Sequence, residues 1–262
     1  MSFTIAGAFP MKIACSDYDG TLFSVTAGIP DETLDAIRAW RAVGHKFGIV
    51  TGRNHSLIQM EIDAYDIPFD FLICSNGASL HTADGTAFAR TPLPHNAMVH
   101  LFRSRHIRSY DGGMLFFTPA RAYVYRHRDD APSSHLTTLT RLEDALQLND
   151  MVQMGLAFQN QEEPCIAFAE IEADFPNVFT GNINRQYLDL NRKGVNKHQG
   201  IADLLRHKNW GDAKLFVIGD DRNDLPMIKA YHGYTVESAQ PFMHEAAHAV
   251  YASVGAMLRM NM

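Results

Sequence analysis

Residues 11–21, Met-Lys-Ile-Ala-Cys-Ser-Asp-Tyr-Asp-Gly-Thr, join a short apolar run to an acidic turn. An apolar run of this length is typical of a parallel strand that is buried on both faces. In a doubly wound sheet, ligands bind beyond the carboxyl ends of the strands, and Asp17 and Asp19 lie at such an end. One carboxylate can attack as a nucleophile while the other moves a proton, and Gly20 eases the turn between them. The stretch therefore predicts a parallel sheet with reactive groups at its edge.

Strands and helices alternate on either side of a middle third of different character, which lies between about His81 and Gln186. The alternation predicts a parallel sheet with helices on both faces. In the middle third, short strands mix with helical patterns. We therefore predict an α/β fold with a doubly wound, mostly parallel, Rossmann-like core at residues 1–82 and 187–262, and an inserted α+β domain at residues 83–186. Within the insert, helices are expected near Pro94–Arg105, Ser134–Leu146 and Gln161–Ala173.

A second acidic cluster, Gly219–Asp224, follows the apolar strand predicted over Lys214–Ile218. Taken alone, the second cluster could simply be acidic residues at a helix N-terminus, which the helix dipole favours. The first cluster, taken alone, could be a solvated acidic turn. Brought together, the two would repel each other unless a cation lies between them, and oxygen ligands suit Mg²⁺. A calcium loop fits poorly, because Leu22 occupies its glycine position and Gly28 its glutamate position. The pair of clusters therefore favours a magnesium site.

Two further segments lie where a phosphate could bind. Thr51-Gly52-Arg53 follows a predicted strand, and a hydroxyl with backbone N–H groups at a helix start can bind phosphate, although the tripeptide is also a common turn. Lys197 begins a predicted helix and could point into the same cleft, although most lysines are solvated. Asn76-Gly77, after the third strand, is typical of a turn. These segments add candidate ligands for an anion.

The composition excludes several classes of protein. The 262 residues carry a net charge of -6, which disfavours a nucleic-acid or polyanion binder. Cys15, Cys74 and Cys165 are too few and too scattered for a disulfide framework or a zinc site. No apolar run approaches a membrane span, and Met1–Pro10 lacks the basic start and long apolar stretch of a secretory signal. We expect a cytoplasmic protein, a monomer or weak homodimer, with no nucleic acid and no membrane as partner.

Together these motifs resemble the four motifs of the haloacid dehalogenase-like superfamily of phosphohydrolases, over nearly all of the chain from Met11 onward. The insert and the segment before it resemble the type IIB cap domain of the Cof-type branch. The residues that carry the resemblance are Asp17–Thr21, Thr51, Lys197 and Gly219–Asp224 for the four motifs, and Ser75-Asn76-Gly77-Ala78 before the cap.

Three positions near the motifs compete with the family pattern or depart from it. Lys193 is a rival for the third motif, but Lys197 is preferred because the family lysine stands at a helix start after a Gly-Val pair. The chain also departs from the branch in two places. Glu237-Ser238-Ala239 stands where an Asn-Ala pair is usual, and Val254-Gly255-Ala256 matches the usual final Gly-Val poorly.

The resemblance implies a magnesium-dependent phosphatase that hydrolyses small phosphorylated metabolites, such as sugar phosphates, through an aspartyl-phosphate intermediate. It implies Asp17 as nucleophile and Asp19 as general acid and base. It implies Mg²⁺ on Asp17, on the backbone carbonyl of Asp19 and on Asp220. The remaining implied roles are phosphate binding by Asp19, Thr51, Gly52, Lys197 and Asn223, orientation of Lys197 by Asp224, and candidate substrate contacts at Arg53, Asn76 and Gly77.

Other functions stay open on the sequence alone. A sugar phosphomutase or another phosphotransferase would use the same Asp17 and pass the phosphoryl group to a hydroxyl instead of to water. A non-catalytic phosphoryl-binding module is less consistent, because it needs neither Asp17 nor Asp19. A dehydrogenase is disfavoured, because the first strand leads into Asp-Tyr-Asp-Gly and not into a Gly-x-Gly turn.

Overall fold

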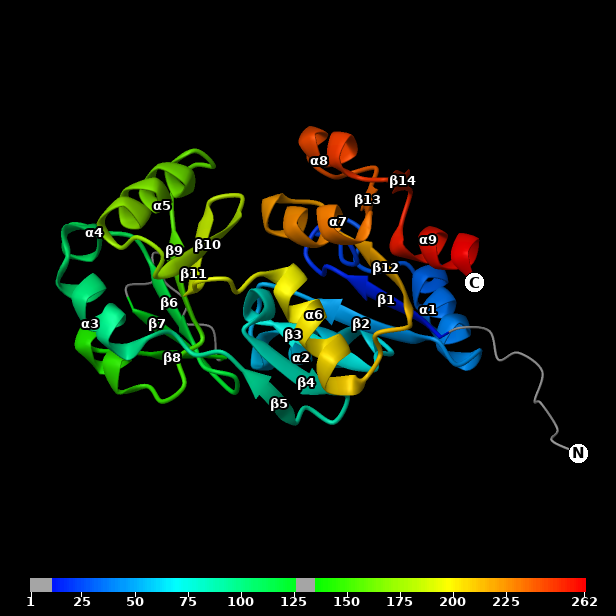
Figure 1. The fold of residues 1–262 in the computed structure, drawn as a ribbon, viewed down its shortest axis with the longest axis horizontal. Helices are drawn as coiled ribbons and strands as arrows, with labels where there is room; N and C mark the ends of the chain where they lie inside the picture. The colour runs from blue at the N-terminus through cyan, green and yellow to red at the C-terminus, as the bar shows by residue number, and fades with distance from the viewer. Residues whose placement is uncertain (1–10, 126–134) are drawn as a thin grey trace, which may run out of the picture.

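Two β-sheets, one in each lobe of the molecule, organise the fold (Figure 1). The computed structural model describes residues 11–125 and 135–262. The strands of the core sheet are β1 (Lys12–Ser16), β2 (Lys46–Val50), β3 (Phe71–Cys74), β4 (Ser79–Thr82), β5 (Ala87–Arg90), β12 (Lys214–Ile218), β13 (Tyr234–Val236) and β14 (Ala249–Tyr251). The strands of the cap sheet are β6 (Met114–Phe117), β7 (Ala122–Tyr125), β8 (Leu136–Thr138), β9 (Gln153–Ala157), β10 (Phe179–Asn184) and β11 (Tyr187–Arg192).

The core sheet has the order β14-β13-β12-β1-β2-β3-β4-β5, and it is parallel except for β4 and β5. Strand β1 lies between β12 and β2, so Ile13, Ala14 and Cys15 have no exposed surface, and this burial explains the apolar run. The parallel register brings the ends of these strands to one edge. There, the backbone N–H of Asp17 donates to Ile218, and that of the residue after β2 donates to β3. The predicted doubly wound core is therefore present.

Helices cover both faces of the core sheet. Helix α1 packs against α9, and α6 packs against α7 and against β3 and β4. Asn54 caps α2 by accepting from Leu57, and Asn196 caps α6 by accepting from Gln199, so both helices begin at the same sheet edge as the acidic turns. The core helices are α1 (Asp31–Ala42), α2 (His55–Tyr65), α6 (Lys197–Lys208), α7 (Leu225–Tyr231), α8 (Pro241–Ala246) and α9 (Val254–Asn261), with 3₁₀ helices at Ser75–Gly77 and Arg222–Asp224.

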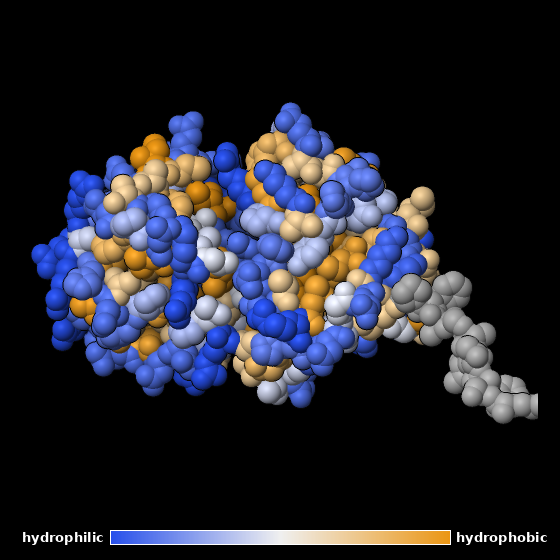
Figure 2. Space-filling model, in the orientation of Figure 1, coloured by the Kyte–Doolittle hydropathy of each residue, from blue (hydrophilic) through white to orange (hydrophobic). Residues whose placement is uncertain are grey.

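The cap sheet has the order β10-β11-β9-β6-β7-β8 and its own apolar core, which includes Phe116, Met154 and Leu190. Its helices are α3 (His95–Arg103), α4 (Arg105–Arg108) and α5 (Glu163–Asp174), with a 3₁₀ helix at Leu142–Gln147. A small apolar cluster, which includes Ala78 of the core and Val152 of the cap, joins the two lobes. On the face shown in Figure 2, hydrophilic residues cover most of both lobes.

Strand pairing places the two connections later in the chain than the predicted boundaries at residues 83 and 186. Strand β5 pairs with β4 in the core sheet, and β11 pairs with β9 and β10 in the cap sheet. A short strand carries no sign of which sheet it joins, and this is why the boundaries shift.

The helix expected over Ser134–Leu146 is wrong in its described part. The structure has strand β8 there, followed by a 3₁₀ helix. Ser134 and Met1–Pro10 lie outside the described residues. None of the helices that the structure describes has both the length and the apolar composition of a membrane span.

Candidate active site

A cavity of about 560 Å³ lies between the two lobes, at the edge where the core strands end. Its core side includes Asp17, Asp19, Gly52, Arg53, Asp220 and Asn223, all of which the sequence predicts as site residues. Its cap side includes Gln153, Asp189 and the β10–β11 turn, Asn184–Tyr187. The cavity therefore combines the predicted polar groups of the core with polar groups of the insert that the sequence did not single out.

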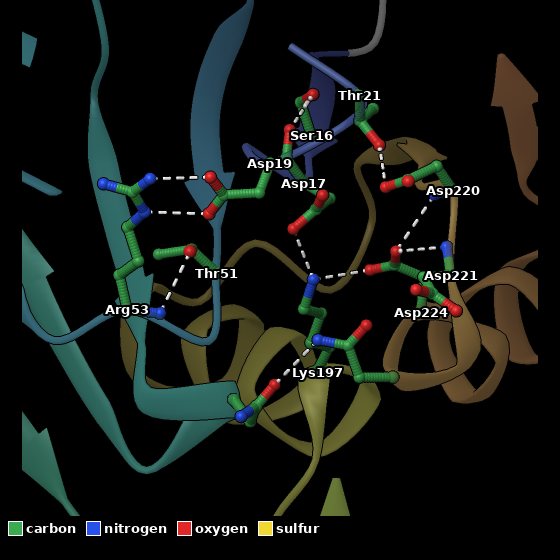
Figure 3. A network of polar contacts seen from close by, with 12 residues as sticks. Ser16, Asp17, Asp19, Thr21, Thr51, Arg53, Lys197, Asp220, Asp221 and Asp224 are labelled. Atoms are coloured by element: carbon green, nitrogen blue, oxygen red, sulfur yellow. Dashed lines mark hydrogen bonds and ion pairs between the residues drawn. The ribbon is translucent and has the colours of Figure 1, made fainter. Parts of the chain in front are cut away.

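Lys197 lies at the centre of the polar network (Figure 3). Its Nζ donates to Asp17 Oδ1 at 2.5 Å and to Asp224 Oδ1 at 2.6 Å, and its side chain has no exposed surface. Burial alone would lower the pKa of Lys197, but the two carboxylates raise it above its ordinary value, so the ammonium stays charged. The rival Lys193 pairs instead with Glu172, and 45% of its side chain is exposed. The structure thus brings Lys197, and not Lys193, to the carboxylates.

Three carboxylates crowd together beside this lysine. Oxygens of Asp17, Asp220 and Asp224 lie within 4.8 Å of one another. Burial, and then the charge of Asp224, raises the pKa of Asp220 to about 6. Burial also raises the pKa of Asp17, with a further contribution from Asp224 and Asp220, although Lys197 opposes it. Such crowding is costly in the absence of a cation, because each carboxylate is both desolvated and repelled.

The residues present fit a divalent cation. Three buried carboxylates share one ammonium, so the cluster keeps an excess of negative charge that a cation would neutralise. Thr21 Oγ1 donates to Asp220 Oδ1 at 2.9 Å and orients that carboxylate. Gly20 has a φ of +89°, and a Cβ there would collide with the carboxylate of Asp220, so the close approach requires glycine. Oxygen ligands in this number suit Mg²⁺.

Asp224 differs from the other two carboxylates because both of its oxygens are already engaged. Oδ1 accepts from Lys197, and Oδ2 accepts from the backbone N–H groups of Asp220 at 3.0 Å and Asp221 at 3.1 Å. These bonds fix the turn after β12 and hold Lys197 toward Asp17. This geometry supports the predicted role of Asp224 as an orienting residue.

Asp19 turns toward Arg53, whereas Asp17 turns toward Lys197 (Figure 3). Arg53 donates from Nη2 to Asp19 Oδ1 at 2.7 Å and from Nε to Oδ2 at 2.8 Å. Its Nη1 donates to Glu61 at 2.7 Å, and its guanidinium lies 5.2 Å from the ring centre of Tyr18. Sequence reasoning missed Glu61 and Tyr18. Glu61 lies on α2, whereas Arg53 precedes the N-cap residue Asn54, so no helical spacing in the sequence relates the two.

The phosphate-binding candidates lie at two depths. Gly52 and Asn223 line the cavity, whereas Thr51 is 1% exposed and accepts from the backbone N–H of Arg53 at 3.1 Å. Asn223 Nδ2 donates to Asn76 Oδ1 at 3.1 Å. Its Oδ1 has no partner among the described residues. Asp19, Gly52 and Asn223 are therefore the phosphate-binding candidates that line the cavity, whereas Thr51 and Lys197 are buried beneath it.

Asn76 and Gly77 do not line the cavity, although the sequence suggested them as substrate contacts. Asn76 has no exposed surface, and its Nδ2 donates to Asp189 Oδ2 at 2.9 Å and to Gln153 Oε1 at 3.2 Å. Gly77 has a φ of +102°, and a Cβ there would collide with the backbone oxygen of Asn196. Both residues lie beneath the cavity because the turn after β3 packs against α6 and the cap strands.

The cap contributes polar side chains that touch the core loops. Gln153 Nε2 donates to Gly52 O at 3.1 Å, and Asn191 Nδ2 donates to Ser75 O at 3.1 Å. The sequence did not single out these residues, because polar side chains in strands are common. For Asp189 there was a signal: Leu188 and Leu190 are buried on either side, so alternation places Asp189 on the opposite face.

The two departures from the branch pattern lie in different surroundings. Ser238, within the segment that replaces the usual Asn-Ala pair, lines the cavity. Gly255, at the start of α9, faces Thr33 of α1, where a Cβ would come within 2.9 Å of the backbone. The first departure can therefore alter what the cavity holds, whereas the second affects helix packing.

Comparison with known proteins gives one consistent result. The haloacid dehalogenase-like hydrolase family matches residues 14–255. YkrA of Bacillus subtilis (strain 168) is 23% identical over 243 residues, which cover 91% of each chain. HMP-PP phosphatase of Klebsiella pneumoniae (strain 342) is 22% identical over 254 residues, which cover 88% of this chain and 85% of that protein.

Among solved structures, the HAD subclass IIB sugar phosphatase BT4131 superposes with a TM-score of 0.79 at 22% identity. The superposition covers 95% of this chain and 97% of that one, and so includes both core and cap. The chain therefore belongs to the haloacid dehalogenase-like hydrolase superfamily.

Proposed function

We propose that the protein is a magnesium-dependent phosphatase that hydrolyses small phosphorylated metabolites through an aspartyl-phosphate on Asp17. The observation that carries the proposal is the pairing of Asp17 with Lys197: one oxygen is held at 2.5 Å, and the other is without a partner among the described residues. A carboxylate fixed in this way keeps one oxygen free for attack. The names of two relatives, HMP-PP phosphatase and the sugar phosphatase BT4131, support a small phosphorylated substrate.

In the first step, Asp17 Oδ2 attacks phosphorus in line with the ester oxygen, and the bond between phosphorus and the ester oxygen breaks. Lys197 reduces the repulsion between the carboxylate and the phosphate, because its charge lies beside both. Gly52 N–H and Asn223 donate to the phosphate oxygens, on which negative charge accumulates, while the buried Thr51 hydroxyl holds the loop by accepting from the backbone N–H of Arg53. Asp17, Asp220 and the carbonyl of Asp19 would hold Mg²⁺, which when bound neutralises part of this charge.

Asp19 donates the proton that the departing alkoxide needs, and then takes a proton from the water that hydrolyses the aspartyl-phosphate. To do so it must exchange its two hydrogen bonds with Arg53 for contacts with the reactants. The side chain of Asp19 is 41% exposed, so its rotation into the cavity disturbs no core packing. Arg53 then remains held by Glu61 at 2.7 Å.

The test is a covalent intermediate on a defined residue. Wild-type protein incubated with p-nitrophenyl phosphate and Mg²⁺ should turn over, and acid quenching should trap a phosphoryl adduct that hydroxylamine removes. Asp17→Asn should abolish both turnover and adduct, because the amide keeps the size of the side chain but is not a nucleophile. Asp66→Asn is the matched control, since Asp66 is exposed and has a left-handed backbone that asparagine tolerates. Turnover in Asp17→Asn near the wild-type rate would refute the mechanism.

A further inference from the structure

Asp189 of the cap is the carboxylate in the cavity that the proposed reaction does not use. It lies on β11 between Leu188 and Leu190, which pack into the cap core, so its own side chain leaves the strand on the cavity side. Gly155 stands opposite it on β9. A Cβ at Gly155 would lie 3.1 Å from Asp189 Oδ1. The glycine thus leaves open the space next to this oxygen.

The two oxygens of Asp189 have different surroundings. Oδ2 accepts from Asn76 Nδ2 at 2.9 Å, which fixes the side chain. A Cβ at Gly52 would lie 3.4 Å from the same oxygen, so the carboxyl group stands beside the proposed phosphate-binding loop. Oδ1 makes no hydrogen bond within the described part of the chain. Its position next to Gly52 means that a ligand group reaching Oδ1 lies close to the phosphate and not at the far end of the cavity.

We infer that Asp189 is a specificity-determining residue that hydrogen-bonds a hydroxyl group of the leaving group near its ester oxygen. The substrates are then phosphate esters of polyhydroxylated compounds, such as sugars or polyols. This inference rests on the proposed phosphatase function and adds to it the residue of the cap that reads the leaving group.

Two observations favour a hydroxyl over an ammonium group. Burial raises the pKa of Asp189 to about 7, although the hydrogen bond from Asn76 and the charge of Lys197 lower it, so both forms exist near neutral pH. A hydroxyl can donate to the carboxylate and accept from the carboxylic acid, whereas an ammonium can only donate. The cap side of the cavity also carries Arg185, which repels a cation, and the neutral side chain of Gln186.

The experiment compares kcat/KM within two pairs of esters that differ in hydroxyl content: glycerol 3-phosphate with n-propyl phosphate, and glucose 6-phosphate with n-hexyl phosphate. The wild type should prefer the hydroxylated member of at least one pair by about 10- to 100-fold, the range for a hydrogen bond to a charged group. Asp189→Leu, which is similar in size, should remove most of this preference. Asp189→Asn should keep a smaller part of it, because a neutral hydrogen bond is about half as strong.

The ratio within a pair is the readout, because a general loss of folded enzyme lowers both members equally. Asp174→Leu is the matched control: it makes the same change on α5, where Asp174 pairs with His106 outside the cavity. A wild type that hydrolyses p-nitrophenyl phosphate but prefers neither hydroxylated ester overturns the inference alone. An unchanged ratio in Asp189→Leu, or in Asp189→Asn if the leucine variant does not fold, also overturns it. If the wild type shows no magnesium-dependent hydrolysis of any ester, the proposed function is wrong as well.

Discussion

Replacement of Lys197 by methionine should cost the protein both stability and activity. Methionine keeps the length of the side chain but leaves Asp17 and Asp224, 3% and 0% exposed, without their shared cation. Removing one partner from a buried ion pair costs about 3–5 kcal/mol, because the remaining charges stay desolvated and now repel each other. Loss of one preorganised electrostatic contact costs on the order of 10²- to 10³-fold in rate. Lys197→Met should therefore show both losses.

Lys193→Met is the matched control for this change. In the wild type, the side chain of Lys193 is 45% exposed and its ammonium pairs with Glu172 at 2.9 Å, an arrangement worth about 0–1 kcal/mol. Urea unfolding near neutral pH gives the free energy of unfolding of both variants, and hydrolysis of p-nitrophenyl phosphate gives their rates. The stability gap between Lys197→Met and wild type should shrink as pH falls, because protonated carboxyl groups need no cation.

The double variant Asp17→Asn/Lys197→Met gives a sharper check. It removes one of the two carboxylates that the single variant leaves unpaired, so it should recover part of the lost free energy of unfolding. The reasoning is refuted if Lys197→Met unfolds within about 1 kcal/mol of wild type, or if Lys193→Met loses as much activity. A double variant less stable than the single one would also contradict it.

Three further predictions concern the metal, Asp189 and the turn after β3. Chelation of divalent cations should abolish hydrolysis and lower the melting temperature, and Mg²⁺ should restore both; activity that survives exhaustive chelation would contradict the proposed metal site. The pKa of Asp189 rises from 3.8 to about 7 on folding, so its contribution to stability is present below about pH 4 and is lost as pH rises to 7. Asp189→Asn should therefore be neutral in acid and stabilising by up to about 4 kcal/mol above pH 7 in urea titrations; equal effects at both ends would be contrary to this. Gly77→Ala should destabilise the protein by roughly 2–5 kcal/mol, because the new side chain both strains the backbone and collides with Asn196. Gly194→Ala, where φ is also positive, at +89°, but the space around it is open, should cost only about 1–2 kcal/mol. Equal losses of stability in the two variants would show that the collision with Asn196 contributes nothing.

The core strands could be predicted well from the sequence, because a strand that is buried on both faces is a nearly continuous apolar run. Strand β12, predicted over Lys214–Ile218, has those bounds, and its last three positions are buried. In the cap, some strands alternate buried and partly buried positions, as β7 does, and the polar and threonine-rich segment after Ser134 was wrongly assigned to a helix. The pairing partner of a strand depends on residues distant in sequence, so β5 and β11 could not be assigned to their sheets beforehand.

Some features of the candidate site could likewise be predicted from the sequence, and others could not. Strand ends predict that Asp17, Asp220 and Lys197 converge, because parallel strands finish at one edge. They do not predict that Arg53 would hold Asp19 by both oxygens, since that contact depends on side-chain rotation. Nor do they predict that Asn76 is buried, because this follows from the cap strands covering the turn after β3.

The amide side chains at the base of the cap limit how far the cap and the core can change independently in evolution. Gln153 and Asn191 reach across to the backbone oxygens of Gly52 and Ser75, and backbone oxygens are present whatever the residue. A foreign cap grafted onto this core would leave Gly52 O without its side-chain donor, and Ser75 O with only the backbone N–H of Ala78, unless it brought equivalent amides on the two corresponding strands. Exchange of whole caps between members of the superfamily is therefore constrained at this seam, whereas loops on the outer side of the cap are free to diverge.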